Sequence, residues 1–219
     1  MKRDLISTTI GMVVLTLVLG VLYPLVITGV SQVAFPGSAN GRQIHVGGRL
    51  VGSALIGQSF ADVVKGANGK VKLDSAGNPV TQPDPRYFQS RPSGTVPADN
   101  AAGSSFANYG PNSIITEQAL AANAQAYLTL ERPYNPGLTV ARIPVDAVDT
   151  SASGIDPDIS PANAAIQAHR IAAVRHLPLA RVKALISTYT HGRGLGFSGE
   201  PGVNVLKLNL ALDRLSRGR

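Results

Sequence analysis

Residues 10–30 read IGMVVLTLVLGVLYPLVITGV, an almost wholly apolar stretch inside a longer run without any charged side chain, residues 5–41. A helix that crosses a membrane needs about 20 such residues. A cleaved signal peptide has an apolar region of only about 7 to 15 residues, followed by a small-residue cleavage site. No convincing A-x-A site follows here. The stretch therefore predicts a single transmembrane α-helix, with residues 1–35 as a membrane anchor.

Two basic residues, Lys2 and Arg3, precede the apolar stretch and indicate its orientation. Positive charge in a short flanking segment favours the cytoplasmic side, whereas a long domain is translocated largely regardless of its charge. We therefore expect a single-pass membrane protein. Its N-terminus is expected in the cytoplasm and its domain, residues 36–219, outside the cytoplasm.

Residues within the span are candidates for packing against a neighbouring membrane helix: Gly11, Thr16, Gly20, Tyr23, Pro24 and Gly29. Small side chains let two helices approach closely in a membrane. Pro24 is also expected either to kink the helix or to mark its outer end. Because Gly and Thr are common in membrane helices in general, that simpler interpretation stays open beside the packing role.

The length and composition of the chain limit what else it contains. Its 219 residues allow one transmembrane helix and one compact domain, which excludes a multi-pass transporter. The absence of cysteine excludes disulfides, thiolate zinc sites and thiol catalysis. The formal charge of +7 is scattered along the chain rather than gathered into one run, so no nucleic-acid partner is expected.

The first part of the domain is predicted to be rich in turns. Alternating apolar residues and Gly-Gly or Asn-Gly signals predict a β-hairpin over residues 40–60, with Ile44/Val46 and Leu50/Val51 in its strands. A region rich in Gly, Pro, Asn and Ser follows, with an apparent insertion at about residues 66–82. Within that insertion, VKLDSAGNPVT is expected to form a small surface hairpin.

The second part of the domain is predicted to be mainly helical. Helices are expected over residues 114–130, from the Ser160 cap to about residue 177, and over residues 178–188. The second helix buries the face made by Ala164, Ala168, Ile171 and Val174. Residues 203–215 alternate like a strand but also carry a helical stripe, and we favour a helix. The fold class is therefore one transmembrane helix followed by one α/β or α+β domain.

Common catalytic signatures are missing from the sequence. It contains no GxxxxGK[ST], GxSxG, SxxK or HExxH motif, which excludes the usual nucleotide hydrolases, esterases, penicillin-binding enzymes and zinc proteases. His169 and His176 lie two helical turns apart without a third His or an acid beside them, so a solvated helix face is favoured over a metal site. We expect no catalytic residue, no metal and no tightly bound cofactor.

The chain as a whole resembles the C subunit of the Kdp potassium-transporting P-type ATPase of bacteria and archaea. The resemblance spans nearly the entire chain in a fixed order of segments: YPLVITGVSQVAFP (23–36), VGSALIGQSF (51–60), YFQSRPSG (87–94), NYGPNS (108–113), SGIDPDISPANAAIQAHRIA (153–172) and GRGLGFSGEPGVNVLKLNLALD (192–213). His191 departs from the family pattern, because an acidic residue is expected there.

This resemblance implies an accessory subunit of a high-affinity ATP-driven potassium uptake complex in the bacterial cytoplasmic (inner) membrane. The implied partners are a channel-like potassium-translocating subunit, an ATP-hydrolysing P-type subunit and a small single-span subunit. This division of labour agrees with the absence of DKTGT and TVGYG motifs. The resemblance also implies a candidate partner surface: Tyr87, Phe88, Arg91, Pro92, Ser93, Asn108, Arg193, Glu200 and Asn204.

Within the family the subunit is described as a catalytic chaperone that raises the ATP affinity of the ATP-hydrolysing subunit. The implied nucleotide contact is the LIGQ loop, with Gly57 and Gln58. The orientation that we predict conflicts with a direct contact, because a domain outside the membrane does not reach cytoplasmic ATP. We therefore expect ATP to act only through the ATP-hydrolysing subunit, and favour assembly, stabilisation and shaping of the outer potassium entrance.

An alternative from another class is an independent membrane-anchored envelope protein that binds a peptide or a glycan. Such a protein needs a concave cleft lined by aromatic residues. The aromatic residues concentrated enough to line one are Tyr87, Phe88, Phe106 and Tyr109. This alternative predicts a domain that stays soluble and active without residues 1–35.

Overall fold

A computed structural model of the chain describes residues 1–95, 97–100, 102–103, 109–110 and 112–217. Phe106 and Asn108, both named above, lie outside the described residues. Contacts within the chain divide it into two compact units, Met1–Ser53 and Ala54–Arg219, which are described separately below. This division does not test the predicted boundary of the membrane anchor at residue 35.

The first unit begins with a long apolar helix. It consists of α1 (Lys2–Leu17), a π-helical turn η1 (Val18–Leu22) and α2 (Tyr23–Ala34). The whole helix covers 33 residues, its most apolar window has a mean hydropathy of 2.6, and no residue of that window is buried. The helix is long and apolar enough to cross a membrane, as the sequence predicts.

Pro24 lies in the first turn of α2, directly after the π-helical turn. A proline inside a helix lacks an N–H donor, and its ring collides with the carbonyl group four residues earlier, here that of Gly20. A π-helical turn widens the backbone at that place and relieves the collision. Pro24 therefore does not end the helix, which continues to Ala34.

The remainder of the first unit is a short helix and a hairpin. Helix α3 (Pro36–Ala39) precedes strands β1 (Gln43–Val46) and β2 (Arg49–Ser53), which pair antiparallel. The turn between the strands, Gly47-Gly48, has φ angles of 58° and 78°, which favour glycine. The hairpin predicted over residues 40–60 is confirmed, and all of its predicted strand residues lie in the strands.

The second unit begins with a small β-arm formed by the apparent insertion. Strands β3 (Ala61–Val63) and β4 (Thr81–Pro83) pair antiparallel, and the chain between them folds back twice through the bridges Lys65–Val71 and Leu73–Pro79. Asp74 holds the second turn by accepting hydrogen bonds from the backbone N–H groups of residues 76 and 78. The predicted surface hairpin is therefore present.

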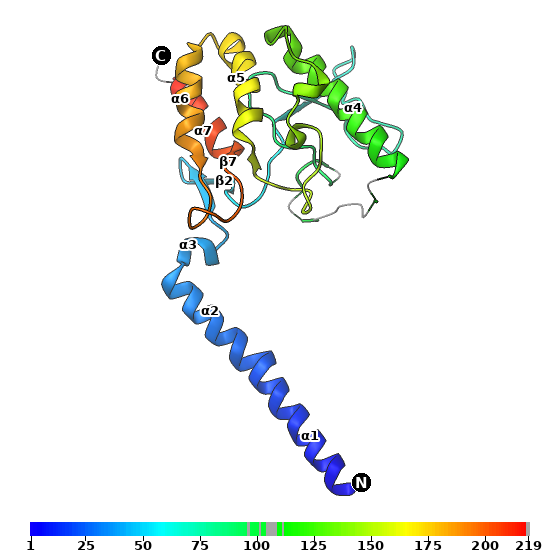
Figure 1. Cartoon of the computed structure of the whole chain (residues 1–219), viewed down its shortest axis with the longest axis vertical. Coiled ribbons are helices and arrows are strands. Elements are labelled where there is room, and N and C mark those ends of the chain that lie inside the picture. The colour runs from blue at the N-terminus through cyan, green and yellow to red at the C-terminus, as the bar shows by residue number, and fades with distance from the viewer. Residues whose placement is uncertain (96, 101, 104–108, 111, 218–219) are drawn as a thin grey trace. The chain divides into compact units, whose positions relative to one another are not determined.

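Helices make up most of the second unit. They are α4 (Ile114–Glu131), α5 (Pro161–Val174), α6 (Leu179–Tyr189) and α7 (Val205–Arg217), with short 3₁₀ turns η2 (Arg132–Tyr134), η3 (Val140–Arg142) and η4 (Val145–Ala147). Helix α5 lies between α4 and α6 (Figure 1). The α5 cap is as predicted, since the Ser160 side chain accepts a hydrogen bond from the Asn163 N–H.

Among the described residues, a small antiparallel sheet of order β5-β7-β6 supports these helices. Its strands are β5 (Asp158–Ile159), β6 (Thr190–His191) and β7 (Gly202–Asn204). The main core is formed by apolar side chains of the helices and the sheet: Phe88, Ile159, Ala164, Ala168, Ile171, Ala172, Leu177, Val182, Ile186, Val203, Val205, Leu208 and Leu212. The predicted buried face of α5 is thus confirmed at its first three positions, whereas Val174 is half-buried.

The last segment combines both patterns seen in its sequence. Its first residues, 203 and 204, belong to β7, and the helix α7 starts at Val205. Asn204 marks the change, because its Oδ1 accepts a hydrogen bond from the Lys207 N–H, as an N-cap side chain does. The predicted helix is confirmed, and the sequence interpretation missed the short strand before it.

Candidate functional site

Residues 87–89 of the YFQSRPSG motif are held by two side-chain amides rather than by a neighbouring strand. Asn209 accepts a hydrogen bond from the Phe88 N–H at 2.9 Å and donates one to the Phe88 carbonyl at 2.9 Å. Gln167 likewise accepts a hydrogen bond from the Gln89 N–H at 2.7 Å and donates one to the Gln89 carbonyl at 3.1 Å. Since Asn209 lies on α7 and Gln167 on α5, the motif is fixed between these two helices.

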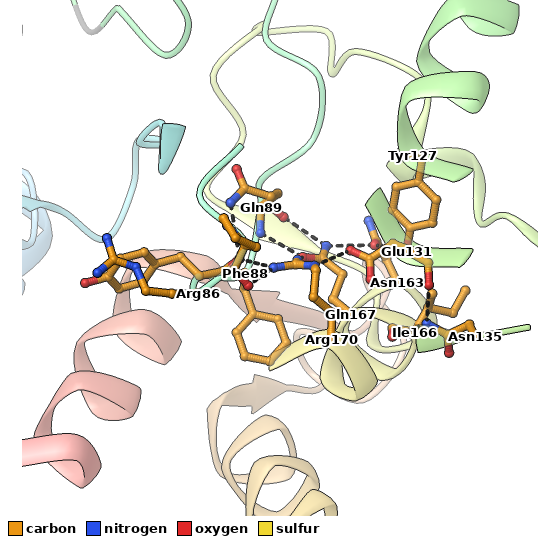
Figure 2. A network of polar contacts seen from close by, with 12 residues as sticks. Arg86, Phe88, Gln89, Tyr127, Glu131, Asn135, Asn163, Ile166, Gln167 and Arg170 are labelled. Carbon is orange, nitrogen blue, oxygen red and sulfur yellow. Dashed lines mark hydrogen bonds and ion pairs between the residues drawn. The ribbon is translucent and has the colours of Figure 1, made fainter. Parts of the chain in front are cut away.

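A buried ion pair stands next to this segment (Figure 2). The Arg170 Nε donates to Glu131 Oε1 at 2.8 Å, and neither side chain is exposed. The other two guanidinium nitrogens donate to the carbonyl groups of Pro85 and Tyr87 and to Gln167 Oε1. Arg170 therefore connects α4, α5 and the chain that leads into the motif.

The carboxyl group of Glu131 is only partly satisfied. Its Oε2 is buried and has no hydrogen-bond partner among the described residues. Burial raises the pKa of this carboxyl group, and the neighbouring Arg170 guanidinium acts in the opposite direction. Because a buried charge that loses its partner is strongly destabilising, the two residues depend on each other.

Further polar side chains extend the network toward the start of α5. Tyr127 donates to Asn163 Oδ1 at 2.9 Å, and Gln167 donates to the same oxygen at 2.9 Å. Asn163 in turn donates to Asp146 Oδ2 at 3.0 Å. Burial raises the pKa of Tyr127, so the phenol stays protonated as the donor in this chain of hydrogen bonds.

The LIGQ loop is packed closely against the chain at residues 155–156. The Gly57 N–H donates to the Ile155 carbonyl at 2.7 Å. A Cβ atom on Gly57 would lie 2.8 Å from the Asp156 carbonyl oxygen and 2.9 Å from Asp99 Oδ1, closer than real Cβ contacts allow. Glycine at this position is therefore required by packing. The neighbouring Gln58 is half-buried, and its carbonyl group accepts a hydrogen bond from Ser90.

Arg91 belongs to the same region as the LIGQ loop. Its Nη1 lies 3.3 Å from Asp156 Oδ2, and its Nη2 donates to the Thr150 carbonyl at 3.1 Å. The Nε atom is buried and has no hydrogen-bond partner within the described part of the chain. The positive charge of Arg91 is thus largely used inside the protein.

Ser93 and Asp99 close the loop that follows the motif. Ser93 donates to the Gly154 carbonyl at 2.9 Å and accepts from the Asp99 N–H at 2.8 Å. Burial raises the pKa of Asp99 to about 6, although its hydrogen bond with Ser93 lowers it. Asp99 also has a φ of 56°, an uncommon value for a residue with a side chain.

A hollow of about 270 Å³ lies beside these groups. Residues that the sequence analysis named line it together, namely Arg91, Pro92 and Ser93, with Asp99 and Tyr127 on the same wall. A larger hollow of about 510 Å³ lies along α4 and residues 148–152, with Tyr109 and Ile115 at its edge. The smaller one is lined by two charged residues, Arg91 and Asp99, and the larger one by one, Asp149, so the smaller one is the better candidate for a polar ligand. Among the described residues, no three His, Asp or Glu side chains gather in a way that holds a metal ion.

The three aromatic residues of the expected cleft that the structure describes, Tyr87, Phe88 and Tyr109, do not meet in one cleft. Phe88 is fully buried in the main core, so the expectation that it lines a cleft is wrong. Tyr87 faces another direction: the Arg175 guanidinium lies 4.7 Å from its ring centre, and its hydroxyl donates to Asp213 at 3.2 Å. Tyr109 belongs to the larger hollow.

The candidate residues near the C-terminus have different roles. Arg193 and Glu200 form an exposed ion pair, in which the Arg193 Nη2 lies 2.9 Å and 2.8 Å from the two carboxylate oxygens. Asn204 is buried and donates to the Ala54 carbonyl at 3.0 Å and to Asp158 Oδ1 at 3.1 Å. Asn204 is therefore a structural residue, whereas Arg193 and Glu200 lie on the surface.

His191, where the resemblance led us to expect an acidic residue, forms an ion pair with Asp158. Its Nε2 lies 2.9 Å from Asp158 Oδ2, and this contact raises the pKa of the imidazole. The pair passes over Gly202, where a Cβ atom would lie 2.7 Å from His191 Nε2. Glycine at position 202 thus leaves room for the pair.

The candidate packing residues of the membrane helix have open surroundings in the chain alone. A Cβ atom on Gly11 or Gly29 would meet nothing within 4 Å, and one on Gly20 would meet Thr16 at 3.9 Å. Tyr23 and Pro24 are exposed. A role of these positions in contacts with another helix stays a prediction.

The sequence did not predict Asp99, which lies in the loop closed by Ser93, or the residues of the buried network: Glu131, Asn163, Gln167, Arg170 and Asn209. For α5 a signal was present, because Asn163, Gln167 and Arg170 follow each other at spacings of four and three, beside the apolar stripe of Ala164, Ala168 and Ile171. Polar residues with this helical spacing next to a buried face indicate a buried network. No comparable local signal pointed to Glu131 or Asn209.

Comparisons with known proteins agree over almost the whole chain. The family model described as "KdpC: K+-transporting ATPase, c chain" matches residues 5–214. Curated relatives named potassium-transporting ATPase KdpC subunit include one from Methylococcus capsulatus, 46% identical over 205 residues, which are 93% of this chain and 94% of the relative. The Ralstonia nicotianae relative is 46% identical, with 92% of this chain and 86% of the relative covered. The Mycobacterium tuberculosis relative is 40% identical, with 98% and 100% covered.

Proposed function

The chain belongs to the KdpC family, the c chain of the K+-transporting ATPase, and on this premise we propose that it is the accessory subunit of a high-affinity, ATP-driven potassium uptake complex. The observation that carries the proposal is a match that covers both the membrane helix and the domain, residues 5–214. The proposed partners are a channel-like potassium-translocating subunit, an ATP-hydrolysing P-type subunit and a small single-span subunit.

The membrane helix supports a place in a complex. Every part of its apolar window is exposed in the chain alone, so it is covered in the cell by lipid or by helices of other subunits. Its small residues at 11, 20 and 29 let a partner helix approach closely. An independent, membrane-anchored binding protein has no need for such positions. It also needs a cleft lined by aromatic side chains, and Phe88 does not line one because it is buried in the core.

We propose that the N-terminus lies in the cytoplasm and that the domain lies outside it. Lys2 and Arg3 flank the short N-terminal end of the helix, and such charges favour the cytoplasmic side. In this orientation the domain acts at the outer potassium entrance, where it assembles and stabilises the complex. Any effect on the ATP affinity of the hydrolysing subunit then acts over a distance, which requires that the domain contacts two states of the pump differently.

The geometry of the LIGQ loop supports an indirect effect over a direct contact with ATP. A loop that cradles a phosphate group offers free backbone N–H groups. The Gly57 N–H is already donated to Ile155, and the space above Gly57 is filled by the Asp156 carbonyl and by Asp99. A negatively charged side chain at this place also disfavours a phosphate.

A labelling experiment tests the orientation. The full chain has no cysteine, so Ser75→Cys introduces a single thiol in the exposed turn of the β-arm. We expect a membrane-impermeant maleimide to label this thiol in intact cells as well as in lysed cells. Labelling only after lysis places the domain in the cytoplasm and makes a direct nucleotide contact the leading mechanism.

A second experiment tests membership in the complex. The full chain, expressed with the other subunits in cells that lack their own copy, is expected to support growth at limiting potassium and to co-purify with those subunits. A chain without residues 1–35 is expected to do neither. If the shortened chain supports growth and the full chain purifies alone, the accessory role is wrong and the independent binding protein takes its place.

A further inference from the structure

The turn between β6 and β7 is exposed and is closed by a pair of backbone hydrogen bonds. The Gly194 N–H donates to the Ser198 carbonyl at 2.7 Å, and the Ser198 N–H donates back to the Gly194 carbonyl at 2.8 Å. The strands on either side belong to the β5-β7-β6 sheet, and Val203 of β7 is fully buried in the core. The tip is therefore a closed loop carried by two paired strands, which reduces the conformational entropy that it loses when it binds.

The tip presents two large apolar side chains to the solvent. Leu195 is 91% exposed and Phe197 is 75% exposed, so neither packs against the protein. Leu195 also has a φ of 51°, a left-handed conformation that a leucine rarely adopts and that costs free energy in the folded chain. A strained turn that holds two apolar side chains away from the core contributes nothing to folding, which indicates that it contributes to binding.

The charges around the tip indicate which kind of partner it binds. Arg193 and Glu200 neutralise each other at the base of the turn, and residues 194–198 carry no charge. Glu200 is itself largely exposed, with 78% of its side chain accessible. A membrane surface with anionic lipids attracts free cations and repels an exposed carboxylate. An uncharged tip with a rigid aromatic anchor instead matches an uncharged, apolar pocket in a protein.

We propose that the turn 194–198 is an anchor that inserts Leu195 and Phe197 into an apolar pocket on the extramembrane surface of another subunit of the complex. This inference rests on the proposed function, because it takes the partner from the same complex. The turn gives the subunit a second point of attachment to the complex, in addition to the membrane helix. The Arg193–Glu200 pair at the base keeps the turn in its binding conformation and surrounds the apolar contact with a polar rim.

Photo-crosslinking of the assembled complex tests the anchor. Phe197 is replaced by the photoreactive amino acid benzoylphenylalanine in the full chain, and the matched control carries the same amino acid at Leu73, an exposed apolar position of the β-arm. We expect a cross-link from position 197 to one other subunit and none above background from position 73. Cross-links only to lipid, only to a second copy of this chain, or equally from both positions overturn the proposal.

A pair of substitutions measures what the anchor contributes. Asn suits the left-handed backbone at 195, so the variant Leu195→Asn with Phe197→Ser removes the apolar tip without straining the turn. We expect its apparent dissociation constant from the other subunits to rise about thirtyfold, the scale of a lost interface anchor. Its melting temperature is expected not to fall, because both side chains are exposed and Asn relieves the strain at position 195. The control Leu73→Asn is expected to bind like the original chain.

The outcomes separate the anchor from the proposed function. If the full chain does not co-purify with the other subunits at all, the proposed function fails and the anchor fails with it. If it co-purifies, but the tip variant binds as tightly as the original chain, the anchor alone is wrong and the accessory role stands. A tip variant with a lowered melting temperature assigns the two side chains to folding instead, and this also overturns the proposal.

Discussion

Arg170 and Glu131 form an ion pair in the interior of the second unit, with Nε 2.8 Å from Oε1 and neither side chain exposed. Such a pair does not stabilise a protein by its mere presence, because the desolvation of two charges offsets their attraction. Its effect lies in the arrangement: the same guanidinium group also binds the Tyr87 carbonyl, so α4 and α5 are fixed to the chain that enters the motif. The pair therefore sets the relative positions of these three segments (Figure 2).

Removal of one partner is expected to be strongly destabilising. Glu131→Ala leaves the Arg170 guanidinium buried without its counter-charge, and we expect the free energy of unfolding to fall by about 3 to 5 kcal/mol. Urea denaturation of the full chain in detergent measures this change. The matched control is Glu200→Ala, which breaks an exposed pair and is expected to cost less than about 1 kcal/mol. Equal losses in the two variants contradict the account.

Gly57 is expected to tolerate no side chain. A Cβ atom there would lie 2.8 Å from a backbone oxygen, which cannot move aside as the end of a side chain can. We expect Gly57→Ala to lower the free energy of unfolding by about 1 to 3 kcal/mol. Gly192→Ala serves as the control, because a Cβ atom at 192 meets nothing within 4 Å and no left-handed backbone is present. If Gly57→Ala leaves stability unchanged but alters the ATP dependence of the pump, the loop acts on the nucleotide and not on packing.

Asp99 is expected to make the stability of the domain depend on pH. Burial raises the pKa of this carboxyl group from 3.8 to about 6, so the folded chain holds the proton more tightly than the unfolded chain. This group therefore makes its full contribution to the free energy of unfolding below a pH of about 3.8, and the contribution is lost as the pH rises through about 6. We expect Asp99→Asn to gain stability, on the order of 1 kcal/mol, at a pH of about 7.5 and little at a pH of about 4. Denaturation curves at both values measure it, and a gain of the same size at both contradicts the prediction.

His191 is expected to act in the same sense, through an ion pair instead of burial. The contact with Asp158 raises the pKa of the imidazole above 6.5, and the nearby Lys207 acts against this. The pair thus stabilises the folded chain fully below a pH of about 6.5, and this stability is lost as the pH rises through the raised pKa. We expect His191→Gln to be destabilised at acidic pH and to approach the original chain at alkaline pH. In chains that carry Asp158→Asn, the same substitution is expected to lose its pH dependence, and an unchanged dependence there contradicts the role of the pair.

Local patterns were sufficient for the membrane helix, the first hairpin and the four longer helices of the second unit. The apolar run predicted the membrane helix, and the glycine pair at 47 and 48 predicted the hairpin turn, because each property depends on residues that are neighbours in the chain. The Ser160 cap and the buried face of α5 followed from helical spacing in the same way. The short strand β7 was missed because its pairing partners, Ile159 and Thr190, lie far away in the sequence.

The tertiary structure decided which residues form the buried polar network. Glu131 and Arg170 are separated by 39 positions, and Phe88 and Asn209 by 121, so no local spacing brings them together. The tertiary structure also decides that position 57 must be glycine. The reason is the nearby Asp156 carbonyl and not the backbone angles at position 57. Hydrophobic length and periodicity act along the chain and can be read from it, whereas the pairing of buried polar groups depends on which segments the core brings into contact.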